Sequence, residues 1–223
     1  MNMKNLIVGQ SGGPTAVINS SLYGVVSEGL RQASVGTVYG MINGIEGFLA
    51  GRILDFQEAL PGPELEKLKT TPGAYLGSCR YKLPESLEDP VYPALFQKFE
   101  ELNIGYFFYI GGNDSMDTVS KLSRYAEKTG SDIRVIGELK TIDNDLIMTD
   151  HTPGFGSAAR YVASTVREIV IDANVYETKS VTIVEIMGRH AGWLTAAGAL
   201  ARKHVEDNPL LIYLPETDFD QEA

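Results

Sequence analysis

Short apolar runs alternate along the chain with longer segments in which apolar residues recur every three to four positions. Short continuous apolar runs are typical of buried strands, and the longer spacing is typical of helices. The predicted strands cover residues 4–10, 37–42, 105–110, 133–137, 181–186 and 209–214. The predicted helices cover residues 16–32, 91–102, 116–128, 158–172 and 193–203. This alternation predicts an α/β fold with a Rossmann-like, mostly parallel sheet, helices on both faces and part of a second α/β domain.

Polar or glycine-rich residues follow five of these strands, in the segments GQSGGPT, YIGGNDS, VIGELKTIDND, VEIMGRHAG and IYLPE. Open α/β sheets bind ligands at the carboxyl ends of their strands. Polar loops also occur in α/β proteins without a ligand. Five such ends, which together carry several glycines and carboxylates, nevertheless favour a binding site.

Composition narrows the setting in which such a site would work. The hydrophobic content of 43% suits a packed core, and the net charge of -10 argues against nucleic acid as a partner. No apolar run is long enough for a membrane span, and the first residues lack the pattern of a signal peptide. Cys79 is the single cysteine, so no internal disulfide can form. We therefore expect a cytoplasmic protein with no membrane partner.

Two glycine-rich loops each connect a predicted strand to a predicted helix. In SGGPT, Gly12 and Gly13 let backbone N–H groups approach an anion at a helix N-terminus, although an ordinary turn would look the same. In GGNDS, Asn113 and Asp114 offer oxygen ligands of the kind that Mg2+ binds. Asp114 or Ser115 could instead serve only as the N-cap of the following helix.

The segment KTIDND, residues 140–145, places a lysine and two carboxylates directly after a predicted strand. A carboxylate can accept the proton of an attacking hydroxyl. A lysine can neutralise charge on a phosphoryl group during its transfer. The alternative is a solvated turn, because Asp and Asn are common turn residues.

GGNDS, KTIDND and the Met187-Gly188-Arg189 segment occur in this order on predicted strand ends, and together they resemble the phosphofructokinase family. The resemblance runs from SGGPT through LPE. Lys140 and Asp114 resemble the pyrophosphate-dependent branch, since ATP-using members characteristically carry glycine at both positions. The resemblance implies Mg2+-dependent phosphoryl transfer from pyrophosphate to the 1-hydroxyl of fructose 6-phosphate, giving fructose 1,6-bisphosphate in glycolysis.

The resemblance also implies roles for individual residues. Asp143 would be the base for the sugar hydroxyl, and Lys140 would stabilise the transferring phosphoryl group. The donor would contact Gly12, Arg80 and Asp114, and the Asp114 carboxylate would exclude ATP by occupying the place of a nucleotide phosphate. Asn113 and Asp145 would hold the metal. The sugar phosphate would be bound by Thr141, Ile142, Asp143, Met187, Gly188, Arg189 and Glu216.

On the same basis, residues 1–137 would form the donor-binding domain, incomplete without a C-terminal return, and residues 138–223 part of the sugar-phosphate domain. Family members continue beyond this length, so we expect a fragment whose full-length form is a homodimer or homotetramer. Three residues depart from the family pattern. Asn113 replaces a common aspartate, Leu139 replaces a usual proline, and Ser180 lies near the position of an arginine that reaches a neighbouring subunit's sugar phosphate.

Three other interpretations of the sequence stay open. The chain could be a truncated, non-catalytic fragment of this fold, or part of an ATP-dependent 6-phosphofructokinase. Residues 154–159, GFGSAA, also match the dinucleotide fingerprint G-x-G-x-x-A of a Rossmann-type oxidoreductase. That fingerprint requires a preceding strand, and no apolar run precedes it here.

Overall fold

The computed structural model describes residues 3–204, 207 and 210–220. The chain divides into two compact units, Met1–Lys140 and Thr141–Ala223, called unit 1 and unit 2 below. None of the described helices is both long enough and apolar enough to cross a membrane.

Unit 1 is built on a five-stranded sheet with the strand order β3-β2-β1-β4-β5. The central strand β1 (Lys4–Gln10) pairs in parallel with β2 (Val35–Met41) and with β4 (Ile104–Gly111). Strand β4 pairs in parallel with β5 (Arg134–Leu139), and the short β3 (Ile53–Asp55) is antiparallel to β2. The prediction of a mostly parallel sheet is confirmed.

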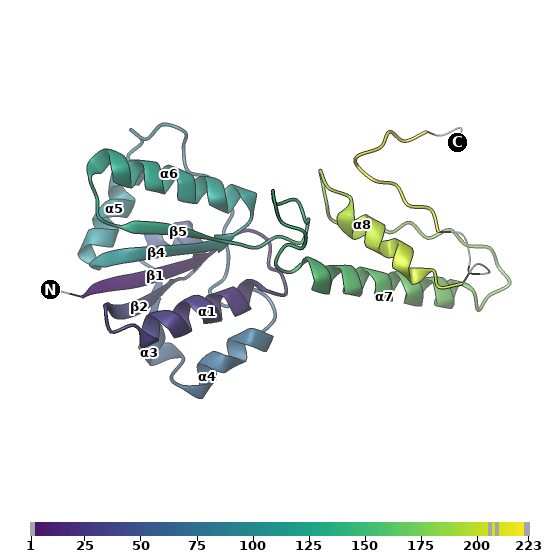
Figure 1. The fold of residues 1–223 in the computed structure, drawn as a ribbon, viewed down its shortest axis with the longest axis horizontal. Helices are drawn as coiled ribbons and strands as arrows, with labels where there is room; N and C mark the ends of the chain where they lie inside the picture. Colours follow the sequence, from purple (N-terminus) through teal and green to yellow (C-terminus); the bar gives the residue numbers. More distant parts are fainter. Residues whose placement is uncertain (1–2, 205–206, 208–209, 221–223) are drawn as a thin grey trace. The chain divides into compact units, whose positions relative to one another are not determined.

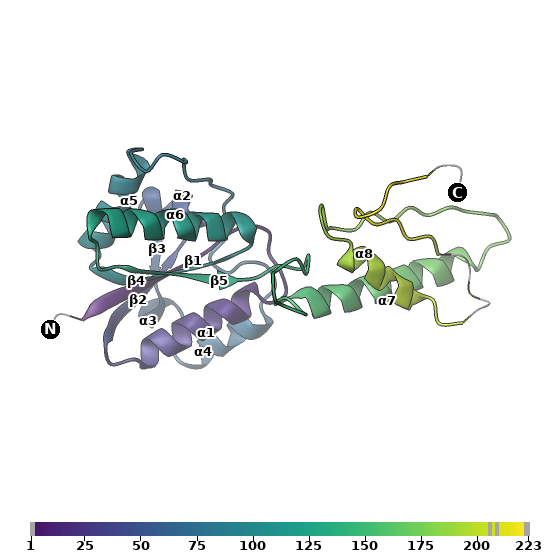
Figure 2. The same cartoon turned by 45° about the horizontal axis from the view of Figure 1, so that its top comes forward.

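Helices cover both faces of this sheet, as expected (Figure 1 and Figure 2). Successive side chains of a strand point to opposite faces. Leu6 and Val8 of β1 therefore pack in one core and Ile7 packs in the other. The first face carries α1 (Ile18–Arg31), α3 (Phe56–Ala59), α4 (Pro63–Glu66) and the 3-10 helix η1 (Lys67–Thr70). The second face carries α2 (Gly44–Leu49), α5 (Val91–Glu101) and α6 (Asn113–Thr129).

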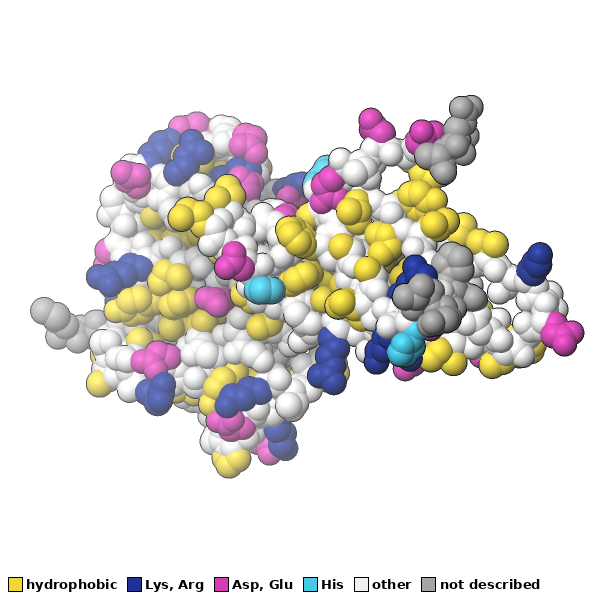
Figure 3. Space-filling view, turned by 45° about the vertical axis from the view of Figure 1, so that its right-hand side comes forward, with side chains coloured by type: hydrophobic (Ala, Val, Ile, Leu, Met, Phe, Trp, Pro, Cys, Tyr) yellow, Lys and Arg dark blue, Asp and Glu magenta, His cyan; other side chains and the backbone are white. Residues whose placement is uncertain are grey.

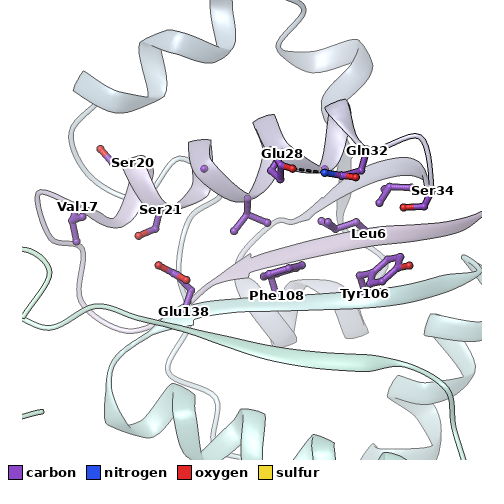
Figure 4. Close-up of a pocket in the computed structure, with 14 residues that line it drawn as sticks. Leu6, Val17, Ser20, Ser21, Glu28, Gln32, Ser34, Tyr106, Phe108 and Glu138 are labelled. Carbon is purple, nitrogen blue, oxygen red and sulfur yellow. Dashed lines mark hydrogen bonds between the residues drawn. The ribbon is translucent and has the colours of Figure 1, made fainter. Parts of the chain in front are cut away.

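The face that carries α1 is open beside β4 and β5. A groove of about 710 Å³ lies between α1 and these strands. Figure 4 shows Tyr106 and Phe108 of β4 and Glu138 of β5 along the side opposite α1. Part of the apolar surface of the sheet is therefore in contact with solvent on this face.

Unit 2 contains α7 (Phe155–Ala173), α8 (Trp193–Ala197) and the 3-10 helix η2 (Gly198–Ala201). Both α8 and η2 pack against α7. The helix predicted over residues 193–203 forms only in part: the α-helix ends at Ala197, η2 ends at Ala201, and residues 202 and 203 are not helical. Figure 3 shows hydrophobic side chains at the surface of this unit. Its exposed residues include Leu200, Leu211 and Tyr213.

Two strand predictions in unit 2 are wrong. Residues 181–186 form no strand, and neither do residues 210–214, while Pro209 lies outside the described residues. A strand exists only where its backbone pairs with a neighbour. Val181 and Ile183 are each 90% exposed, so this apolar segment has joined neither a sheet nor a core.

Candidate active site

The loop after β1 is held against the segment that carries Arg80. The Gly12 N–H donates to the Cys79 carbonyl at 3.1 Å, and the Ser78 hydroxyl donates to the Gly12 carbonyl at 2.5 Å. The Ser11 hydroxyl also donates to the Cys79 carbonyl, at 3.4 Å. Gly12 has a φ of 78°, in the left-handed region that favours glycine. Gly12 and the exposed Arg80 therefore belong to two loops that are hydrogen-bonded to each other.

Cys79, which precedes Arg80, and Tyr109 of β4 are both buried. The Tyr109 hydroxyl lies 3.6 Å from the Cys79 sulfur, and a side chain at Gly44 would meet that sulfur at 2.7 Å. Burial raises the pKa of the Tyr109 hydroxyl well above its ordinary value, so this group stays neutral. The pair acts as packed support for the loop that carries Arg80.

Lys140, the residue after β5, joins the two glycine loops. Its N–H donates to the Gly111 carbonyl at 3.0 Å, which extends the pairing of β4 with β5. Its ammonium group donates to the Gly13 carbonyl at 2.7 Å, and the residue is only 5% exposed. A Cβ added to Gly12 would lie 3.5 Å from the ammonium nitrogen. The sheet therefore places a buried cation beside the Gly12–Gly13 loop, at the carboxyl ends of its strands.

The second glycine loop leads directly into α6. The helix begins at Asn113 with Gly112 as its N-cap, so neither Asp114 nor Ser115 has the N-cap role weighed above. A Cβ at Gly111 would lie 1.9 Å from the Ser115 hydroxyl oxygen, so this strand end needs glycine for the helix to approach. The backbone N–H groups at the N-terminus of a helix favour an anion, so the start of α6 suits one.

Asp114 lies in the first turn of α6, where the helix dipole stabilises a carboxylate. The Lys82 ammonium lies 3.4 Å from its Oδ1, and both side chains are largely exposed, at 73% for Lys82 and 82% for Asp114. Exposed ion pairs of this kind contribute little stability. The pair instead places one negative and one positive charge near the N-terminus of α6.

Asn144 closes the loop that carries Asp143. Asn144 has a φ of 58°, its Oδ1 accepts from the Thr152 N–H at 2.9 Å, and its Nδ2 donates to the Asp150 carbonyl at 3.1 Å. The Thr152 hydroxyl donates to the Thr141 carbonyl at 2.7 Å, and the Asp143 N–H donates to the Thr141 hydroxyl at 3.1 Å. Asp143 is thus half-buried in a cross-linked loop. Sequence reasoning missed Asn144 and Thr152; the tolerance of asparagine for positive φ was the available signal.

Glu216 lies beside the loop that follows Arg189. Its Oε1 accepts a hydrogen bond from the Gly192 N–H at 2.7 Å, at the start of α8. Gly188 has a φ of 132°, and a Cβ there would lie 2.2 Å from the Ala191 carbonyl oxygen. The loop therefore requires glycine at position 188, and Arg189 is exposed.

The predicted site residues thus form three groups, each built from its own segments. In unit 1, the loops hold Gly12, Arg80, Asn113, Asp114 and Lys140. In unit 2, one loop holds Thr141, Ile142, Asp143 and Asp145, and a second region holds Met187, Gly188, Arg189 and Glu216. Lys140 and Thr141 are consecutive, so a peptide bond links the first group to the second.

Asn113 and Asp145, the predicted metal ligands, supply oxygen atoms and are both exposed. Within the described residues, no cluster of three or more His, Cys, Asp or Glu side chains could hold a metal alone. Mg2+ is commonly bound through one or two carboxylates together with water and substrate phosphates. Each of these two residues therefore offers oxygen atoms whose chemistry suits Mg2+.

The dinucleotide fingerprint lacks its structural context. Gly154, with a φ of 99°, is the N-cap of α7, and no strand leads into it among the described residues. The structure therefore gives no support to the oxidoreductase interpretation.

Comparison with known proteins identifies similar chains. The sequence pattern of the phosphofructokinase family matches residues 5–223. A pyrophosphate–fructose 6-phosphate 1-phosphotransferase from Rhodospirillum rubrum is 46% identical over 96% of this chain and 52% of its own length. The crystal structure of a pyrophosphate-dependent phosphofructokinase from Nitrosospira multiformis superposes with a TM-score of 0.90 at 40% identity, over 99% of this chain and 55% of its own. The corresponding enzyme from Marinobacter aquaeolei gives a TM-score of 0.86 at 43% identity, over 98% of this chain and 55% of its own. The chain spans about half the length of the curated relatives it matches.

Proposed function

Because this chain belongs to the phosphofructokinase family, we propose that its full-length form transfers a phosphoryl group from pyrophosphate to the 1-hydroxyl of fructose 6-phosphate. The products would be fructose 1,6-bisphosphate and phosphate, in glycolysis. The observation that carries this proposal is the ammonium of Lys140, buried beside the Gly12–Gly13 loop at the carboxyl ends of the strands. In an ATP-using relative this position characteristically carries glycine, which has no charge to offer.

Unit 1 would bind the donor. Backbone N–H groups of the Gly12–Gly13 loop and of the first turn of α6 suit phosphate oxygens. Arg80 and Lys140 would add two positive charges, which would offset the net charge of -10 near the donor. Phosphoryl transfer depends mainly on positioning and on charge stabilisation, and these groups supply both.

Asp143 would act on the acceptor. Its carboxylate would take the proton of the 1-hydroxyl as the sugar oxygen bonds to the terminal phosphorus of pyrophosphate. The bond from that phosphorus to the bridging oxygen breaks, and phosphate leaves with the bridging oxygen. The hydrogen-bonded loop around Asn144 would hold the base in place throughout.

Residues 138–223 would bind the sugar phosphate. Thr141, Ile142 and the Met187–Arg189 segment would contact fructose 6-phosphate, and the exposed guanidinium of Arg189 suits its phosphate group. Glu216 would accept a hydrogen bond from a sugar hydroxyl, since its carboxylate has two oxygens and Oε1 accepts from Gly192.

Enzymes of the phosphofructokinase family generally use Mg2+, which we assign here to Asn113 and Asp145. When bound, the ion would neutralise charge on the donor phosphates. An amide at position 113 is a weaker ligand than a carboxylate, so the donor phosphates themselves would supply much of the coordination. The proposal includes a cytoplasmic location and a homodimeric or homotetrameric full-length form.

The test is a coupled assay of a full-length form of the protein. Aldolase and its coupling enzymes would report fructose 1,6-bisphosphate formed from fructose 6-phosphate and pyrophosphate. We expect turnover that requires all three of sugar phosphate, pyrophosphate and Mg2+. Absence of product with pyrophosphate, in protein that is folded and supplied with Mg2+, contradicts the proposal.

A further inference from the structure

We propose that Gln10 and Asn19 are positioning residues that hold Arg80 in place for the donor, an inference that rests on the proposed function. Arg80 lies within residues 71–90, a stretch without helix or strand between η1 and α5. Such a stretch has no ladder of backbone hydrogen bonds to fix its path, so other groups must satisfy and hold its backbone.

Gln10, the last residue of β1, is completely buried. Its Nε2 donates to the Ile18 carbonyl at 3.1 Å and to Oδ1 of Asn19 at 3.0 Å. Its Oε1 accepts from the Leu76 N–H at 2.9 Å. The side-chain amide therefore joins the end of β1, the start of α1 and the segment that leads to Arg80.

Asn19, in the first turn of α1, is 2% exposed and completes the same network. Its Oδ1 accepts from the Tyr75 N–H at 2.8 Å as well as from Gln10, and its Nδ2 donates to the Thr71 carbonyl at 2.8 Å. The two amides thus satisfy three backbone groups of residues 71–76, which would otherwise be partly buried without partners.

The network acts on Arg80 through a short length of chain. Immediately after Leu76, the hydroxyl of Ser78 and the carbonyl of Cys79 form hydrogen bonds with Gly12. Residues 71–79 are therefore attached at two places, first by Gln10 and Asn19 and then by the Gly12 loop. Arg80 directly follows the second attachment, at Cys79. Both attachments join Arg80 to the end of β1, where the donor phosphates would lie.

Asn5 offers a matched control because it is also an amide on β1, at the opposite end of the strand. Its Nδ2 donates to the Leu102 carbonyl at 2.8 Å, and its Oδ1 accepts from the Thr37 N–H at 2.8 Å. Like Gln10, it joins β1 to backbone groups of neighbouring segments. If both amides only stabilise the fold, replacing either should have the same kinetic effect.

The experiment compares Gln10→Leu and Asn5→Leu in the full-length form, with KM measured separately for pyrophosphate and for fructose 6-phosphate. We expect Gln10→Leu to raise the KM for pyrophosphate about tenfold or more, since small displacements of a binding group can cost this much. The KM for fructose 6-phosphate should change by less than about twofold, as should both values in Asn5→Leu. In an Arg80→Ala background, Gln10→Leu should have little further effect on pyrophosphate, because coupled residues are not additive.

The outcomes separate this inference from the proposed function. If the parent protein shows no turnover with pyrophosphate, the proposed function is wrong. With an active parent, the inference is wrong if both amide variants shift the KM for pyrophosphate alike, or if the Gln10→Leu effect persists without Arg80. Should Gln10→Leu fail to fold, Asn19→Ser is the second variant, because it removes the amide that bonds Thr71, Tyr75 and Gln10. An unchanged KM for pyrophosphate in that variant equally refutes the inference.

Discussion

Replacement of Lys140 by methionine tests the chemical role of the buried ammonium. Methionine keeps most of the length and apolar stem of lysine but removes the charge. The variant loses the hydrogen bond of 2.7 Å to the Gly13 carbonyl and keeps the backbone bond of 3.0 Å to the Gly111 carbonyl. The end of β5 should therefore stay paired while the cation disappears from the Gly12–Gly13 loop.

The size of the effect follows from the position of the charge. Two unit charges about 4 Å apart interact by about 4 kcal/mol at an effective dielectric near 20. The loss of one group that stabilises transition-state charge typically lowers kcat about 10²–10³-fold. The hydrogen bond to Gly13 is charge-assisted, so its loss should lower the free energy of unfolding by about 1–3 kcal/mol.

Lys121→Met is the matched control for this experiment. Lys121 is also buried, at 3% exposed, and its ammonium also donates to a backbone carbonyl, that of Leu83, at 3.1 Å. It forms further ion pairs with Glu85 at 2.6 Å and Asp117 at 2.7 Å. Lys121→Met should lower the free energy of unfolding by about 1–3 kcal/mol, as Lys140→Met should. Its kcat should stay within about threefold of the parent value, because Lys121 has no place at the donor.

The assay is steady-state turnover with saturating pyrophosphate and fructose 6-phosphate, with urea unfolding of each protein in parallel. If the Lys140→Met variant is folded and its kcat lies within about threefold of the parent value, Lys140 does not stabilise phosphoryl transfer. Equal losses of kcat in both variants would show that the effect arises from stability and would refute the electrostatic reasoning.

Three further predictions concern neighbouring residues. Asp143→Asn should lower kcat by about 10²–10⁴ while the KM for fructose 6-phosphate changes little, and near-normal kcat would remove Asp143 from its role as base. Asp114→Gly should tighten ATP binding about tenfold in calorimetric titration, since Lys82 offsets part of the carboxylate charge; unchanged ATP affinity contradicts the idea that Asp114 excludes ATP. Gly111→Ala should lower the free energy of unfolding by about 1–3 kcal/mol because its Cβ would lie 1.9 Å from the Ser115 hydroxyl oxygen. A Gly111→Ala protein as stable as the parent in urea would show that α6 does not need this close approach.

The elements of unit 1 that the sequence predicted are those with strong internal patterns. Strands β1 and β4 are rich in buried apolar residues, so each appears as a short apolar run. Helices α1 and α6 are long enough for their apolar spacing to be recognised. The antiparallel β3 and the short helices α2 to α4 were missed, because three to six residues hold too little of either pattern.

Unit 2 was harder to predict because a strand forms only where a neighbouring segment pairs with it. The apolar run over residues 181–186 has the composition of a strand, but composition does not supply the neighbouring backbone with which a strand must pair. Within the site, the glycine loops and the KTIDND segment could be identified from their places after strands. The hydrogen bonds of Gln10, Asn19 and Asn144 could not, because they join segments that are brought together only by the fold.

The most direct test of the central claim compares pyrophosphate with ATP as donor for fructose 6-phosphate, at matched Mg2+, in a full-length form of the protein. The account predicts a higher kcat/KM for pyrophosphate, because Lys140 lies buried beside the Gly12–Gly13 loop and Asp114 lies at the start of α6. A higher kcat/KM for ATP would contradict it.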